Sequence, residues 1–120
     1  MSKMTTATIV AELIAALNDR SPAVRQRAAE TLGELEEVQA VEPLTRALKD
    51  SYADVRIHVA LALGMIGDMS ATAPLTYALK NEEDEIVKGA LETALDMVKQ
   101  KVMRKKMRVF FRESLVIHAQ

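Results

Sequence analysis

The sequence repeats itself with a period of 31 residues. Apolar and turn residues recur at this spacing in four sets: Leu13, Leu44 and Leu75; Leu17, Leu48 and Leu79; Val24, Val55 and Ile86; Asp19, Asp50 and Asn81. The seven residues that begin at Pro43 also recur at Pro74 with one difference. A fixed period of this length is typical of stacked units that bury their apolar faces against one another.

The pattern within each repeat predicts two short helices, because apolar residues recur at helical spacing. We expect one domain over residues 1–120, with repeats at about 7–37, 38–68 and 69–100 and a basic helix or tail at 99–120. In the first repeat, Ser21 and Pro22 read as the N-cap and first residue of a helix that runs to about Leu35, with Val24 and Leu35 inward.

Glycines mark two further features of the second helices. Gly33 and Gly64 lie inside them, where a glycine costs about 1 kcal/mol relative to alanine. We therefore expect a neighbouring backbone to approach closely at both positions. Gly67 is placed to end its helix in the left-handed conformation, and Asn81 is expected to cap the last helix.

Composition excludes several classes of protein. The 120 residues contain no cysteine, so disulfides and thiolate chemistry are excluded. No apolar run approaches the ~18 residues of a membrane span, and residues 1–6 lack the features of a signal peptide. We expect a cytoplasmic protein.

The motif Asp-x-x-x-x-Val-Arg, followed by Leu-Gly-x-Ile-Gly-Asp and Ala-x-x-Pro-Leu, resembles the HEAT-like repeat of the phycobilisome (PBS) lyase type. The middle repeat carries it in full: Asp50, Val55, Arg56, Leu63, Gly64, Ile66, Gly67, Asp68, Ala73, Pro74 and Leu75. The third repeat departs from it, keeping Asn81 and Ile86 but placing Val87 where the arginine belongs.

This resemblance implies an all-α fold, a right-handed α-α superhelix (a short α-solenoid) of three helix pairs with a long C-terminal helix or tail. The second helix of each pair would line a concave side. The resemblance also implies a ladder of ion pairs, in which Arg25 and Arg56 bond toward the turns around Asp50 and Asn81.

Residues for catalysis are scarce. The two histidines, His58 and His118, have no metal-ligand companion at helical spacing. The acidic run Glu82–Glu85 suits the start of a helix, because four consecutive residues do not converge on one point. The sequence contains no phosphate loop and no nucleophile elbow. We expect no enzyme activity, no cofactor and no metal.

A second apolar stripe on the middle repeat is the first candidate site. Ile57, Leu61 and Met65 recur every four residues, and His58 lies beside them. At the matching positions the other repeats are polar: Gln26, Glu30 and Glu34 in the first, and Lys88, Glu92 and Asp96 in the third. The stripe can be covered by the chain's own C-terminal segment, by a homodimer contact or by a partner protein.

The basic C-terminal segment is the second candidate site. Residues 99–120 carry seven basic residues and one acidic residue, whereas residues 1–98 carry nine and 16. The basic residues singled out are Lys101, Arg104, Lys105, Lys106 and Arg108. Because Met103, Met107 and Phe110 or Phe111 recur at helical spacing, we expect a helix that seals the end of the stack. The alternatives are binding to an acidic partner, a membrane surface or nucleic acid.

The expected function is therefore a non-enzymatic protein–protein interaction module that binds a partner protein through the concave face of its second helices. One alternative is binding of nucleic acid or an acidic partner through the basic helix. A second, carried by the family resemblance alone, is an accessory role in handling bilins or phycobiliproteins. The form of residues 109–120 stays open between a helix turn, a strand and a docking tail.

Overall fold

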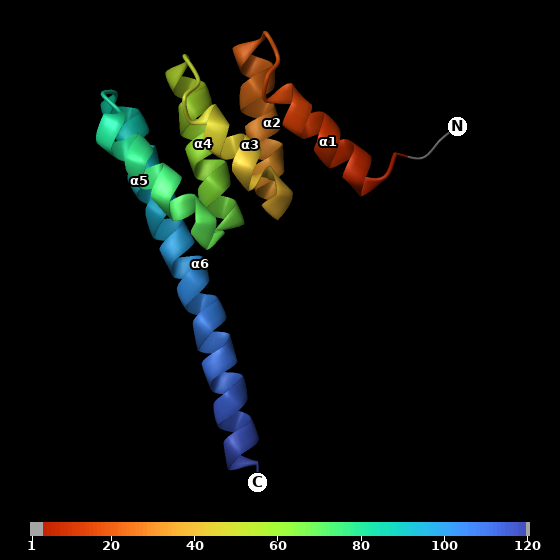
Figure 1. The fold of residues 1–120 in the computed structure, drawn as a ribbon, viewed down its shortest axis with the longest axis vertical. Helices are drawn as coiled ribbons and strands as arrows, with labels where there is room; N and C mark the ends of the chain where they lie inside the picture. Colours follow the sequence, from red (N-terminus) through yellow and green to blue (C-terminus); the bar gives the residue numbers. More distant parts are fainter. Residues whose placement is uncertain (1–3, 120) are drawn as a thin grey trace.

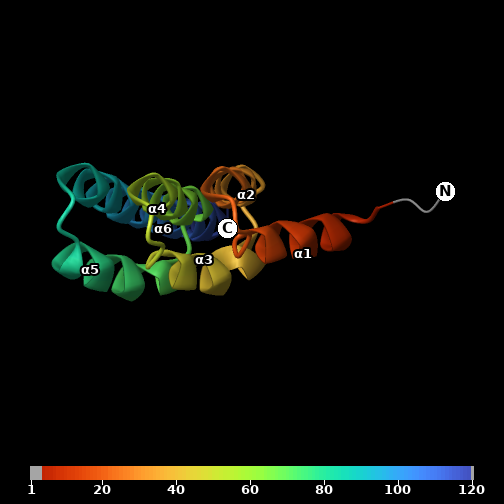
Figure 2. The same ribbon diagram turned by 90° about the horizontal axis from the view of Figure 1, so that it is seen from above.

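The computed structural model describes residues 4–119, which fold into helices joined by short turns. The α-helices are α1 (Thr6–Ala16), α2 (Pro22–Glu34), α3 (Val41–Ala47), α4 (Ala53–Ile66), α5 (Thr72–Asn81) and α6 (Glu85–His118). Two short 3-10 helices, η1 (Val38–Ala40) and η2 (Met69–Ala71), precede α3 and α5. The views in Figure 1 and Figure 2 show α2, α4 and α6 in one layer and α1, α3 and α5 in the other. The predicted all-α stack of helix pairs is confirmed.

Local sequence sets the helix ends. The Ser21 hydroxyl accepts a hydrogen bond from the backbone N–H of Val24, and Pro22 is the first residue of α2. Gly67 ends α4 with φ 69° and ψ 27°, and its N–H donates to the carbonyl of Leu63 at 3.0 Å. Both predictions are confirmed, because the left-handed conformation at Gly67 favours a residue without a side chain.

The predicted cap of the last helix is wrong. Asn81 is the final residue of α5, and its side-chain amide donates back to the carbonyl of Tyr77. The cap is Asp84, whose carboxylate accepts from the N–H groups of Ile86 and Val87 at 2.9 and 3.0 Å. An acidic side chain at this position also interacts favourably with the positive end of the helix dipole.

The second helix of the third repeat, α6, follows the second helix of the middle repeat, α4, by 32 residues rather than 31. Val87 is 1% exposed and occupies the place of Val55, whereas Ile86 is 72% exposed. Buried residues match at this offset along both helices: Val55, Val59, Ala62 and Ile66 in α4, and Val87, Leu91, Ala94 and Val98 in α6. Helix α5 ends at Asn81, three residues later than the period would place it, and the turn that follows is two residues shorter than the one before α4. Helix α6 therefore begins one residue late.

Two residues expected inside the stack lie at its surface. Val24 is 40% exposed and Leu35 is 45% exposed. Val24 belongs to α2, the outermost helix of its layer, and so lacks the covering neighbour that buries Val55 in the central α4 (Figure 1). Leu35 is the residue at which α2 ends.

The glycines bring the second helices into backbone contact. A Cβ atom added to Gly33 would lie 2.8 Å from the Cα of Ala62, and one added to Gly64 would lie 3.0 Å from the Cα of Ala94. The predicted close approaches are therefore confirmed. They hold α2, α4 and α6 at a spacing that larger residues would prevent.

Helix α6 is much longer than the stack that it closes. Its 34 residues span about 51 Å at 1.5 Å per residue. The buried face ends at Val98, and Figure 1 shows the rest of the helix projecting beyond the other helices. Phe110 and Phe111 are 62% and 56% exposed. The predicted seal is therefore wrong, because both Phe side chains lie on the part of α6 that projects past the stack.

The ambiguous C-terminal segment is helical. No proline or glycine occurs between Gly89 and the C-terminus, and α6 continues through His118. Of the segment 109–120, only Gln120 lies outside the described residues.

Candidate functional site

The apolar stripe of α4 lies half-buried between α2 and α6. Ile57, Leu61 and Met65 are all of intermediate exposure, and Ile57 also packs against the core. Neither neighbouring helix covers them fully. The C-terminal part of α6 projects beyond the other helices (Figure 1), and the stripe stays half-covered.

His58 connects this stripe to the polar side chains of α2. Its Nδ1 donates to the carbonyl of Asp54 at 2.7 Å, which fixes the ring. The other ring nitrogen lies 3.1 Å from a carboxylate oxygen of Glu30 and 3.4 Å from the Gln26 amide nitrogen. Glu34, one turn beyond Glu30, is exposed. Polar and acidic side chains of α2 therefore border the stripe. The contacts of His58 are those of a residue that holds the structure together rather than those of a catalytic residue.

The α6 border differs from the prediction. At the observed offset of 32, the residues that match Ile57, Leu61 and Met65 are Gly89, Thr93 and Met97, rather than Lys88, Glu92 and Asp96. Met97 is half-buried and lies over Gly64, just as Met65 lies over Gly33. Sequence reasoning missed Met97, although the alternative spacing from Val55 to Val87 was present as a signal.

Lys101 belongs to this surface and not to the projecting helix. Its ammonium group donates to the carbonyl of Met65 at 3.1 Å and pairs with the Glu36 carboxylate. Its aliphatic chain lies against Gly67. Hydrogen bonding to Lys101 lowers the pKa of Glu36 below its ordinary value. Lys101 therefore joins the middle of α6 to the C-terminal ends of α2 and α4.

The other four basic residues lie apart from the stripe. Arg104, Lys105, Lys106 and Arg108 are exposed on the projecting part of α6. None of the ion pairs formed within residues 4–119 includes them. The structure therefore divides the predicted site residues into two surfaces, one on the stack and one on the projection.

The arginine ladder runs along the turns of the stack. Arg25 donates from Nε and Nη2 to the two carboxylate oxygens of Asp50, at 2.7 and 3.1 Å. Arg56 makes the same two-point contact with Glu82, at 2.9 and 3.0 Å, and donates to the carbonyl of Asp50 at 2.8 Å. The predicted direction of both arginines is confirmed, although Glu82 rather than Asn81 accepts from Arg56.

Both carboxylates of the ladder have depressed pKa values. Burial acts to raise the pKa of Asp50, but hydrogen bonds from Arg25 and from the N–H of Tyr52 outweigh it. Burial likewise acts to raise the pKa of Glu82, and hydrogen bonds from Arg56 and the N–H of Asp84 outweigh it. Both pKa values therefore lie below their ordinary range, which favours the charged forms in the folded state.

The ladder makes the stability of the fold sensitive to acid. An unfolded chain takes up protons at the ordinary carboxyl pKa of about 4, before the folded chain does, so stability falls as pH drops through and below this value. We expect the melting temperature of the wild type to fall between pH 6 and pH 3 by more than that of Glu82→Gln, which is less stable at neutral pH. Equal losses in both proteins would contradict the role of Glu82.

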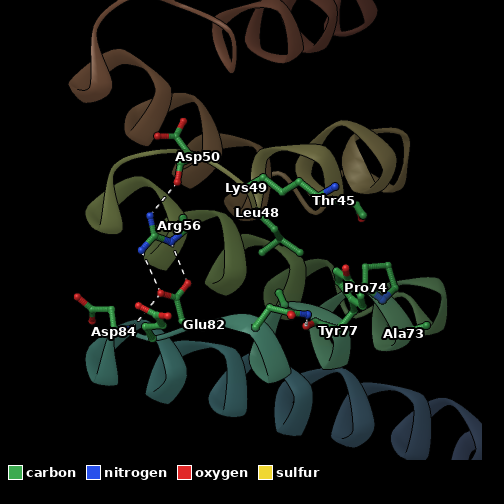
Figure 3. A pocket seen from close by; sticks show the side chains of 13 residues that line it. Thr45, Leu48, Lys49, Asp50, Arg56, Ala73, Pro74, Tyr77, Glu82 and Asp84 are labelled. Atoms are coloured by element: carbon green, nitrogen blue, oxygen red, sulfur yellow. Dashed lines mark hydrogen bonds and ion pairs between the residues drawn. The ribbon is translucent and has the colours of Figure 1, made fainter.

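A groove of about 960 Å³ lies between α3 and α5 in the opposite layer. Figure 3 shows Leu48, Pro74 and Tyr77 along it, with Arg56 held between Asp50 and Glu82 at one end. The Arg56 guanidinium is already engaged by these protein oxygens. The groove therefore presents apolar walls and a satisfied ion pair, with the charged side chains of Lys49 and Glu83 also along it.

Residues 4–119 contain no group of three or more His, Cys, Asp or Glu side chains that could hold a metal ion. Within the same range, no helix combines the length and apolar character needed to cross a membrane.

Comparison with known proteins places the chain in a family. A family model described as HEAT repeats matches residues 10–96. No curated protein matches the sequence. The match runs from within α1 to within α6, so it takes in the stacked helices and the arginine ladder but not the projection. Because it covers well over half of the sequence, the chain belongs to the HEAT repeat family.

Proposed function

We propose that this chain is a non-enzymatic protein–protein interaction module, and that a partner protein binds across the layer formed by α2, α4 and α6. HEAT repeats commonly mediate interactions between proteins, and the family is generally non-enzymatic. The observation that carries the proposal is the α4 stripe of Ile57, Leu61 and Met65, which the rest of the chain leaves half-covered.

Covering the stripe would stabilise a complex. Full burial of a leucine, isoleucine or methionine side chain is worth about 1.5–3 kcal/mol. Because the stripe residues are already half-buried, part of that free energy is still available to a partner that covers them. Met97 extends the apolar surface onto α6, next to the exposed carboxylates of Glu92 and Asp96. With the acidic α2 border on the other side, the surface suits a partner that carries apolar side chains flanked by basic ones.

The helix spacing supports a concave surface on this side. Gly33 and Gly64 allow the second helices to approach at backbone contact, as the distances to Ala62 and Ala94 indicate. A stack whose helices lie closer together in one layer than in the other curves toward the closer layer. We propose that the second helices line the inner face, in a single domain of three repeats.

The test is replacement of Leu61 by glutamate. A carboxylate in the centre of the stripe would have to be desolvated on binding, so we expect partner capture from an extract of the source organism to weaken at least tenfold, or about 1.4 kcal/mol. Tyr77→Glu, which alters an exposed side chain of α5 in the opposite layer, is the matched control and should capture normally. Circular dichroism checks that both variants are folded.

A third variant tests the alternative binding surface, the basic projection of α6. If Arg108→Glu loses the captured material while Leu61→Glu keeps it, the function belongs to the basic projection. Nuclease treatment then distinguishes nucleic acid from an acidic protein. Undiminished capture by Leu61→Glu contradicts the proposal. The phycobilisome lyase subtype, with its role in bilin handling, and the cytoplasmic location stay predictions.

A further inference from the structure

The projecting part of α6, residues 103–118, exposes most of its large apolar side chains. This segment, the α6 extension, has exposed fractions between 45% and 71% at Met103, Met107, Val109, Phe110, Phe111, Leu115, Val116 and Ile117. The stack does not cover them, because the extension lies beyond the other helices (Figure 1). A contiguous apolar surface of this kind marks a site that another molecule covers.

Most of these side chains fall on one side of the helix. With about 100° of rotation per residue, an arc of about 160° contains Ile117, Phe110, Met103, Met107, Phe111 and Leu115. Ser114 and His118 also fall within this arc. Val109 and Val116 lie on the opposite side, two turns apart, and singly exposed valines are ordinary on protein surfaces. The extension therefore has one broad apolar face.

This apolar face is directed away from the stack. The earlier part of α6 packs on the stack through the buried residues Val87, Leu91, Ala94 and Val98. On the same helical projection, these residues centre about 180° from the apolar face. A flat surface can therefore meet the apolar face while the stack lies on the far side of α6.

The extension is also strongly basic. It carries one acidic residue, Glu113, and five basic residues, Arg104, Lys105, Lys106, Arg108 and Arg112. Lys106 falls at one edge of the apolar face, and Arg104 and Arg108 fall at the other edge. Long basic side chains in such positions can keep their charges at a polar surface while the apolar side chains between them are buried.

Along one edge, arginine and apolar side chains line the same groove. This open groove has a volume of about 600 Å³, and its lining includes Met107, Phe111 and Leu115 together with Arg104, Arg108 and Arg112. None of the ion pairs formed within residues 4–119 includes these arginines. Their guanidinium groups are therefore available to phosphate oxygens, which arginine binds well.

We propose that the α6 extension binds the surface of a bilayer that contains anionic phospholipid. The apolar face enters the boundary between headgroups and acyl chains, and the basic residues at its edges contact the phosphates. Helices of this kind bind through buried apolar area combined with attraction to anionic lipid. A nucleic acid would engage the basic side chains but leave the ring of Phe110 in water.

The same side of α6 changes character where the extension begins. Glu92 and Asp96 are exposed on the stack part of α6 and fall on the side that carries the apolar face farther along. An anionic surface repels these carboxylates. The bound surface is therefore confined to the extension, and the stack with its α4 stripe stays clear of the lipid.

Tryptophan fluorescence tests which side of the helix meets the lipid, because the chain contains no tryptophan. Phe110→Trp in the full chain places the reporter on the apolar face, and Val109→Trp places it on the opposite side. On addition of vesicles made of equal parts phosphatidylglycerol and phosphatidylcholine, we expect a blue shift of the emission for Phe110→Trp and none for Val109→Trp. No shift at position 110, or equal shifts at both positions, would overturn the proposal.

Co-sedimentation with the same vesicles measures the affinity of a charge-matched pair of variants. Phe110 and Val109 are 62% and 53% exposed, so glutamate at either position should leave the fold intact, which circular dichroism checks. Val109→Glu should weaken binding by roughly fivefold, the effect of one charge near an anionic surface. Phe110→Glu should weaken it by roughly 100-fold, because it also removes a buried ring. Equal weakening by both would contradict the assignment of the apolar face.

The composition of the vesicles tests the part played by charge. We expect binding to phosphatidylcholine alone to be at least tenfold weaker, and binding to the anionic vesicles to weaken as salt is raised. Equal affinity for neutral and anionic vesicles would contradict the role of the basic residues. A wild type that ignores both kinds of vesicle, but captures an acidic protein through Phe110, would replace lipid by that protein.

The lipid surface and the proposed partner surface are tested separately. Leu61→Glu alters the α4 stripe and should bind anionic vesicles as the wild type does. Phe110→Glu should in turn capture the protein partner as the wild type does. Loss of vesicle binding in Leu61→Glu would show that the extension alone does not hold the lipid.

Discussion

Replacing Gly33 with valine is expected to lower the free energy of unfolding by about 3 kcal/mol, the upper end of the range for overpacking. Even the first added carbon would lie 2.8 Å from the backbone Cα of Ala62, and backbone cannot move aside as a flexible side chain can. Helices α2 and α4 would have to separate, and the packing along their length would loosen. Urea denaturation followed by circular dichroism measures the change.

Gly89 provides the matched control for this prediction. It also lies inside a helix, α6, but a Cβ atom added there meets nothing within 4 Å. Gly89→Ala is therefore expected to raise the free energy of unfolding by about 0.5–1 kcal/mol, because alanine favours helix more than glycine does. If Gly33→Ala were to stabilise the chain as much as Gly89→Ala, the close helix contact would be refuted.

Replacing Leu63 with alanine is expected to cost about 2–5 kcal/mol of stability. Leu63 is fully buried in α4, the helix that contacts both α2 and α6. The cavity left behind would lie at the centre of the stack, where neighbouring helices on both sides restrict collapse. The same denaturation measurement applies.

Leu35→Ala is the control for the leucine experiment. This side chain ends α2 and is 45% exposed, so its removal should cost about 1 kcal/mol or less. Comparable losses at Leu63 and Leu35 would mean that Leu35 lies inside the stack, as the apolar pattern alone suggested.

The sequence was most informative where one residue type has one structural use. Pro22 after Ser21, Gly67 at the end of α4, and the interior Gly33 and Gly64 each predicted a local geometry that the structure confirms. The 31-residue period predicted the layered helix pairs, because each set of recurring leucines must be buried by a neighbouring repeat.

The sequence was least informative at the ends of the stack. Val24 carries the same pattern as Val55, yet only Val55 has a second helix on both sides. One additional residue before α6 places Val87 in the core where the 31-residue period predicted Ile86. A fixed period cannot predict such an insertion.

The projecting helix was equally hard to foresee. The Met and Phe pattern of α6 indicates an amphipathic helix wherever it lies. Whether Phe110 seals the stack or lies past its end depends on where α4 and η2 end in space. The local sequence pattern of α6 does not contain that information.

The continuous α6 helix also acts as a rigid spacer. From Val98, the last buried residue, to Phe110 there are 12 positions, so Phe110 lies about 18 Å along the helix beyond the buried face. Each residue inserted into this part of α6 would move Phe110 about 1.5 Å farther from the stack and turn it by about 100° about the helix axis. The length of α6 thus sets both how far from the stack the exposed side chains of its C-terminal part lie and which way they face.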